Sequence, residues 1–123
     1  MELNRITGKI VSSAIEVHKI LGPGLLESSY HNCLKYELIK SGFYVESELY
    51  LPIKYKEIKL EKAYRIDLLI NNSVVVEVKA VDAINEVHIA QALTYMKFSE
   101  ISLGLILNFN TKLMTNGIKR LIQ

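Results

Sequence analysis

The sequence contains a single cysteine, Cys33, which excludes an intrachain disulfide and any zinc site built from several cysteines. Long apolar runs are also missing, because the longest are strand-sized, such as residues 74–76, whereas a membrane-spanning helix needs about 20 apolar residues. Neither a signal peptide nor a transit peptide precedes the first amphipathic segment. These absences together predict a cytoplasmic protein that does not associate with membranes.

Strong net charge is absent as well. The formal charge is +2 over 123 residues, which neither indicates nor excludes nucleic-acid binding. The length predicts one domain, residues 1–123, with an ordinary globular composition. Four lysines and one arginine nevertheless gather within residues 54–65. By charge alone, this cluster is more typical of a solvated hairpin face than of a binding site.

The spacing of apolar residues changes along the chain from helical to strand-like and back. Apolar residues three or four apart predict helices, whereas runs of β-branched and aromatic residues predict strands. The resulting order, α-α-β-β-β-β-α-β-α, predicts a mixed α/β (α+β) layered domain. The predicted helices are 3–21, 25–41 and 84–99 with a short one from residue 116, and the predicted strands are 45–51, 53–60, 64–70, 74–80 and 103–109.

Three carboxylates occupy positions where the pattern predicts apolar side chains. Glu27 lies three residues before Tyr30, on the face of its helix that should meet the core. Asp67 and Glu77 each interrupt an apolar strand. If residues 71–73 form a three-residue hairpin loop, Asp67 faces Glu77 across the sheet.

The same register places Arg65 opposite Lys79. Two carboxylates so close together in a half-buried sheet repel each other, and a divalent cation between them would remove the repulsion. The residues alone leave open an exposed salt-bridge patch made of Arg65, Asp67, Glu77 and Lys79. Glu27 by itself is more typical of a carboxylate that a helix dipole favours at its N-terminus.

The order of these residues resembles the PD-(D/E)xK nuclease superfamily. Asp67, separated by nine residues from Glu77-Val78-Lys79, is similar to the Asp…(Asp/Glu)-x-Lys signature of that superfamily. Ile66 stands where the superfamily's name has a proline. The resemblance implies a restriction-endonuclease-like core, in which a mixed central β-sheet is flanked by helices.

Two further motifs resemble branches of the same superfamily. Gln91 and Tyr95 match the Gln-x-x-x-Tyr motif of RecB-type relatives. Residues 24–30 match the Gly-x-x-Glu-x-x-Tyr pattern of a widespread bacterial family within the superfamily. The segments that further resemble that family are His18, residues 22–24, residues 107–110 and residues 117–120, so that the resemblance covers nearly the whole chain.

The resemblance implies a nuclease that hydrolyses phosphodiester bonds in DNA or RNA, with DNA favoured. Glu27, Asp67 and Glu77 would then supply oxygens to Mg²⁺ or Mn²⁺, together with the carbonyl of Val78. Lys79 would orient the attacking water or stabilise the negative charge that builds up on the phosphate.

Supporting roles are implied for residues around this set. His88, Gln91 and Tyr95 share one edge of a predicted helix, and the resemblance gives Gln91 and Tyr95 a part in organising the site. His18 is predicted at the edge of the site, whereas His88 is equally typical of a histidine without a chemical role. Tyr30 is predicted to pack and hold its helix in place.

Nucleic acid is the predicted partner, and the small size also suggests a homodimer or a complex with a larger protein. Two alternatives remain. One is a nuclease fold that binds nucleic acid or a protein without cleaving; the other is a structural protein whose acidic cluster is a salt-bridge patch. Only a metal site predicts that added metal stabilises the protein.

Overall fold

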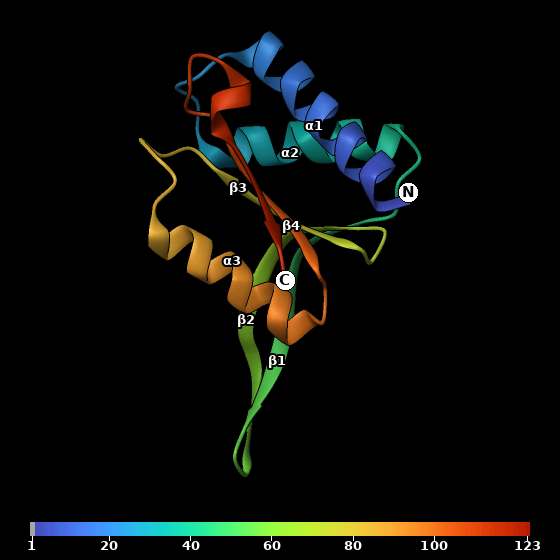
Figure 1. Ribbon diagram of the computed structural model, residues 1–123, viewed down its shortest axis with the longest axis vertical. Coiled ribbons are helices and arrows are strands. Elements are labelled where there is room, and N and C mark those ends of the chain that lie inside the picture. The colour runs from blue at the N-terminus through green and yellow to red at the C-terminus, as the bar shows by residue number, and fades with distance from the viewer. Residues whose placement is uncertain (1) are drawn as a thin grey trace.

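Five strands form one mixed sheet in the computed structural model, which describes residues 2–123 (Figure 1). The strands lie in chain order across the sheet, β1-β2-β3-β4-β5. β3 and β4 are parallel, and every other neighbouring pair is antiparallel. The strands are β1 (Val45–Tyr55), β2 (Ile58–Ile70), β3 (Val74–Lys79), β4 (Leu103–Asn108) and β5 (Ile118–Ile122).

Helices cover both faces of the sheet (Figure 1). α1 and α2 pack on one face, and α3, which connects the parallel strands β3 and β4, packs on the other. No helix within residues 2–123 is long and apolar enough to cross a membrane. The helices are α1 (Glu2–Leu21), α2 (Glu27–Lys40), α3 (Glu86–Ser99) and the short 3₁₀ helix η1 (Met114–Gly117).

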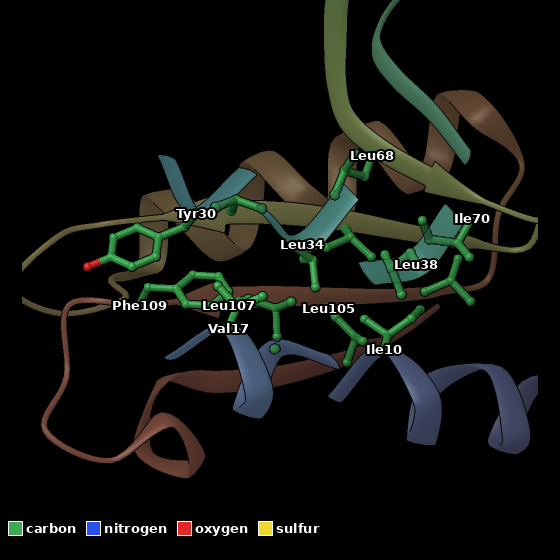
Figure 2. Packing of buried hydrophobic residues seen from close by; sticks show 14 of the residues in the cluster. Ile10, Val17, Tyr30, Leu34, Leu38, Leu68, Ile70, Leu105, Leu107 and Phe109 are labelled. Carbon is green, nitrogen blue, oxygen red and sulfur yellow. The ribbon is translucent and has the colours of Figure 1, made fainter. Parts of the chain in front are cut away.

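The larger core lies between the sheet and α1 and α2 (Figure 2). Ile10 of α1 and Leu34 of α2 are fully buried against strand residues such as Leu68 and Leu107. A second core lies under α3, where Met96 packs so closely on Gly104 that a side chain at that position would clash with its sulfur. The two cores hold the sheet from both sides, as expected for strands apolar on both faces.

Tyr30 anchors the loop between α1 and α2. Its ring stacks on Phe109 with centroids 4.7 Å apart, and the two rings lie together in Figure 2. Its hydroxyl donates to the Gly22 carbonyl over 2.6 Å and accepts from the Leu25 N–H over 3.0 Å. The predicted packing role of Tyr30 is confirmed, and these contacts fix the position at which α2 begins with Glu27.

Tyr30→Phe should destabilise the protein by about 1 kcal/mol, because it retains the stacked ring but leaves two partly buried backbone groups without their partner. Urea unfolding measures this free energy. Tyr36→Phe on the same helix is the matched control, since Tyr36 is 61% exposed, and its unfolding midpoint should not change. Equal stability of both variants would show that the hydroxyl of Tyr30 does not hold the loop.

The number of strands before α3 was predicted wrongly. Residues 53–60 and 64–70 were predicted as separate strands, but between residues 45 and 70 the chain reverses direction only at Lys56 and Glu57, between β1 and β2. Pro52 shifts the register of β1 against β2 and does not end the strand, because β1 is an edge strand and tolerates a residue without an N–H.

The predicted final helix was also wrong. The segment that contains residues 116 and 117 is the last part of η1 and leads into β5, which extends the sheet beside β4. Gly117 is required there by close approach, because a Cβ at this position would collide with the backbone carbonyl of Asn108. Its role is thus steric.

Candidate active site

The site forms where β2 and β3 separate. Pairing of these strands ends at Leu68 and Val76, in the predicted register. Beyond that point, the backbone N–H of Asp67 donates to Glu77 Oε2 over 3.0 Å, and the N–H of Val78 donates to Asp67 Oδ2 over 2.9 Å. Two carboxylates therefore take the places of backbone carbonyls, and the predicted proximity of Asp67 and Glu77 is confirmed.

The side-chain alternation of β2 breaks at Asp67. Leu68 packs in the core under α1 and α2, whereas Ile66 packs in the core under α3, although alternation would put both on one face. Across the sheet, the unpaired position of β1 is Glu48, which has a left-handed φ of 51°. This irregularity turns Asp67 towards a cavity beside α2.

The cavity has a volume of about 310 Å³ and lies between the first turn of α2 and strands β1 and β2. Glu27, the first residue of α2, is exposed there and shares the cavity with Asp67. The structure therefore brings Glu27 to the site from a distant part of the chain. The residues that line the cavity are Glu27, Ser28, His31, Asn32, Glu48, Arg65 and Asp67.

The paired carboxylates are buried, with exposed fractions of 6% for Asp67 and 3% for Glu77. Burial, and after it the charge of Asp67, raises the pKa of Glu77 to about 8. Hydrogen bonding from the Asp67 backbone and the charges of Lys79 and Arg65 offset these effects only in part. Because both carboxylates are buried, the alternative of an exposed salt-bridge patch is wrong, and the raised pKa of Glu77 favours a proton or a cation on the pair.

Arg65 faces the cavity and does not lie opposite Lys79 as predicted, because the pairing of β2 with β3 ends before reaching it. Its guanidinium contacts Glu48 at 3.0 Å and Asp67 at 3.4 Å. Burial alone would lower the pKa of Arg65, but Asp67 and Glu48 outweigh it and raise that pKa. The spacing of Arg65 two residues before Asp67 in a strand was the signal that could have identified it.

On the other side of the carboxylates, α3 contributes Gln91 and Tyr95. Lys79 Nζ donates to Gln91 Oε1 over 3.2 Å, which ties the lysine of β3 to the helix. Burial, followed by the charges of Glu77 and Asp67, raises the pKa of Tyr95. Tyr95 therefore keeps its hydroxyl proton and lies within the electrostatic influence of both carboxylates.

The two histidines predicted near the site make backbone contacts. His88 Nδ1 accepts from the N–H of Asn85, and Asn85 Oδ1 accepts from the N–H of His88, which together cap the start of α3. His18 is buried and its Nε2 lies 2.7 Å from the Thr111 carbonyl. His18 lines a different cavity from the one at Asp67, and a chemical role for either histidine stays a prediction.

A model of the PD-(D/E)XK nuclease superfamily matches residues 4–121. The chain belongs to the PD-(D/E)XK nuclease superfamily. The observed mixed sheet between helices is consistent with the restriction-endonuclease-like fold of that superfamily, so the predicted fold class is confirmed. No match was found among curated proteins or among solved structures. Membership supports a nuclease function with nucleic acid as the partner.

PD-(D/E)XK nucleases generally use divalent metals, and the donor chemistry here fits such an ion in part. Asp67 and Glu77 offer adjacent hard oxygen ligands whose mutual repulsion a cation would remove. Across residues 2–123, however, no three acidic, histidine or cysteine side chains are gathered as a ready metal site. Glu27 lies on the α2 wall of the cavity and has not joined the other two carboxylates.

Removing the Glu77 charge should reduce the pH dependence of metal-free stability. The folded-state pKa of Glu77, about 8, exceeds its ordinary value of 4.5, so the folded protein binds this proton more tightly than the unfolded chain. The stability that it contributes is complete below pH 4.5 and is lost as the pH rises towards 8. Urea unfolding in EDTA, compared between wild type and Glu77→Gln across this range, should show a steeper decline for wild type. Parallel profiles would contradict the raised pKa.

Proposed function

We propose that this protein is a metal-dependent nuclease that hydrolyses phosphodiester bonds in DNA or RNA. The observation that carries the proposal is the buried pair Asp67 and Glu77 at the separation of β2 and β3. Two adjacent buried carboxylates repel each other, and this costs stability near neutral pH that their backbone hydrogen bonds only partly offset. Such a pair is therefore best explained by a cation that it binds during function.

Asp67, Glu77 and the Val78 carbonyl would hold Mg²⁺ or Mn²⁺, and Glu27 would complete the ligand set from α2. When bound, this ion supplies Lewis-acid chemistry, which polarises the scissile phosphate and lowers the pKa of a water. The hydrogen bonds from the Asp67 and Val78 backbones hold one oxygen of each carboxylate, so the orientation of both groups is fixed before an ion arrives.

Lys79 would act on the phosphate or on the attacking water. It lies two residues after Glu77 in β3, and its contact with Gln91 Oε1 keeps the ammonium on the α3 side of the sheet. A fixed positive charge there would stabilise the negative charge that develops on the phosphate. Because its pKa is raised, Tyr95 keeps a hydroxyl proton that it can donate at the same edge.

Titration with Mg²⁺ and Mn²⁺ should raise the melting temperature of wild type but not of Asp67→Asn or Glu77→Gln. A ligand at a hundred times its Kd adds about 2.7 kcal/mol of stability, which a thermal melt resolves. Both substitutions retain an oxygen that can accept the same backbone hydrogen bond, so each variant should fold.

Glu16→Gln, an exposed position on α1, is the control for the loss of one negative charge and should respond to metal like wild type. A wild-type protein that gains no stability, with or without a nucleic-acid substrate, would count against the metal site. Equal gains in wild type and Asp67→Asn would place the ion elsewhere.

Lys79→Gln should lower kcat by about 10²–10³ while the stabilisation by metal is retained, because the lysine acts on the transition state and is not a ligand. Gln91→Ala should cost about fivefold, as expected for one hydrogen bond to the lysine. Cleavage of single-stranded, duplex and branched DNA and of RNA measures both. Lys97→Gln, exposed on α3, serves as the control, and full activity of Lys79→Gln would refute its role.

A binding module without turnover is the second candidate. The observation that favours it is that Glu27 has not joined Asp67 and Glu77 in a shared site within the described part of the chain. A protein that binds DNA, gains no stability from metal and cleaves none of these substrates would be such a module. The homodimer or larger complex predicted from the chain's small size stays a prediction.

A further inference from the structure

The β1–β2 hairpin extends beyond the rest of the fold as an arm, here defined as residues 50–65 (Figure 1). The arm contains five basic and two acidic residues, a net charge of +3, whereas the whole chain has +2. The rest of the chain is therefore slightly acidic. The positive charge of this protein is concentrated on its most protruding element.

The two faces of the arm differ in character. Leu51 and Ile53 pack against the core under α3, so this face continues the core outwards. On the opposite face Lys54 pairs across the strands with Lys59, and closer to the body Tyr50 pairs with Arg65. One face of the arm is thus apolar and the other is basic.

Lys54 and Lys59 stand directly opposite each other, a placement of like charges that destabilises a sheet. Within residues 2–123, the ion pair that offsets this repulsion is the one between Lys59 and Glu61, at 3.9 Å. Both of its side chains are largely exposed, so the pair contributes little. An anion between the two lysines would relieve their repulsion.

The basic face leads to the candidate active site. Its inner end is Arg65, whose guanidinium lies 3.4 Å from Asp67 and lines the same cavity as Glu27. Lys59 lies six residues earlier in β2, which at about 3.3 Å per residue is at most about 20 Å from Arg65. An extended polyanion could therefore contact the lysines and the cavity at the same time.

The exposed tyrosines of the arm are covered by cations. Lys62 Nζ lies 5.0 Å from the ring centroid of Tyr50, and Lys56 Nζ lies 5.4 Å from that of Tyr55. A base would have to displace these ammonium groups in order to stack on the face of either ring that they cover. The arm offers charge, which suits the phosphates of a nucleic acid and not its bases.

We propose that the basic face of the arm, formed by Lys54, Lys59, Lys62 and Arg65, binds the phosphodiester backbone of the nucleic-acid substrate and guides it to the cavity at Asp67. This inference rests on the proposed nuclease function and adds to it the surface that holds the substrate. Since phosphates are the same in every sequence, the contact is independent of sequence.

The test compares Lys54→Gln/Lys59→Gln with Lys9→Gln/Lys40→Gln, which removes two exposed lysines from α1 and α2. Fluorescence anisotropy with a labelled mixed-sequence DNA duplex and single strand, in EDTA, measures affinity over a range of salt concentrations. The arm variant should lose affinity on the order of tenfold near 0.1 M salt. The slope of log K against log salt should fall by about 2, and the control should match wild type in both.

An arm variant that keeps the wild-type affinity and slope would overturn the proposal and leave the lysines as charges that keep an edge hairpin soluble. The proposal would also be overturned if light scattering gave the arm variant a different molar mass from wild type while its slope of log K against log salt stayed the same. The arm would then contact protein. Wild type that binds neither DNA form nor a matching RNA would do the same.

Failure of the proposed nuclease function can be distinguished from failure of the arm proposal, because binding is measured without metal. A wild type that neither cleaves nor gains stability from metal, beside an arm variant with a reduced salt slope, refutes the nuclease and supports the arm. Melting temperatures no lower than that of wild type for both lysine variants confirm that neither result comes from unfolding.

Discussion

The structure depends on a pair of reciprocal hydrogen bonds at the point where β2 and β3 part. Asp67 and Glu77 each accept an N–H from the other strand and so replace the backbone pairing that ends at Leu68. The exchange satisfies backbone donors that would otherwise be buried without partners. It also leaves two carboxylates in an apolar sheet, an arrangement that every neighbouring element must accommodate.

Residues 108–110 bring the elements around this pair together. The N–H of Phe109 donates to the Lys79 carbonyl, which fixes the end of β3, and its ring stacks on Tyr30 at the start of α2. The side chain of Asn108 accepts from the Val81 N–H and donates to the Val81 carbonyl, which holds the segment that leads to α3. One short segment therefore positions β3 and α2 directly and the approach to α3, and these elements carry Lys79, Glu27 and Gln91. Substitutions there would disturb the site without contacting a substrate.

The sequence could predict the centre of the site because its determinants are local. Asp67 and Glu77 meet because a three-residue loop, visible in the sequence, fixes the register of their strands. The face of α3 that carries Gln91 follows from helical periodicity in the same way. Arg65 was misplaced because its position depends on an irregularity at Glu48, where a residue other than glycine or asparagine adopts a left-handed φ.

The errors at Pro52 and Gly117 have a similar origin, since both residues are typical of chain breaks. In the fold, however, an edge position tolerates Pro52, and the nearby Asn108 carbonyl requires Gly117. Whether such a residue ends an element depends on its tertiary neighbours, which apolar spacing does not encode. Local chemistry was therefore predictable, and tertiary constraint was not.

The distribution of charge suggests an order in which the substrate and the cation would reach the proposed site. Without a cation, the buried carboxylates at Asp67 and Glu77 repel phosphate, and the proton that Glu77 retains removes only part of that charge. The lysines of the arm attract phosphate at a distance from this repulsion, because at physiological salt charges more than about 8 Å apart are largely screened from each other. If the proposed metal site and arm both hold, a polyanion would be held by the arm while the carboxylates stay empty, and it would advance to the cavity once a cation had reversed the local charge. Separating attraction from chemistry in this way would allow one small domain to hold a polyanion and to keep an acidic centre.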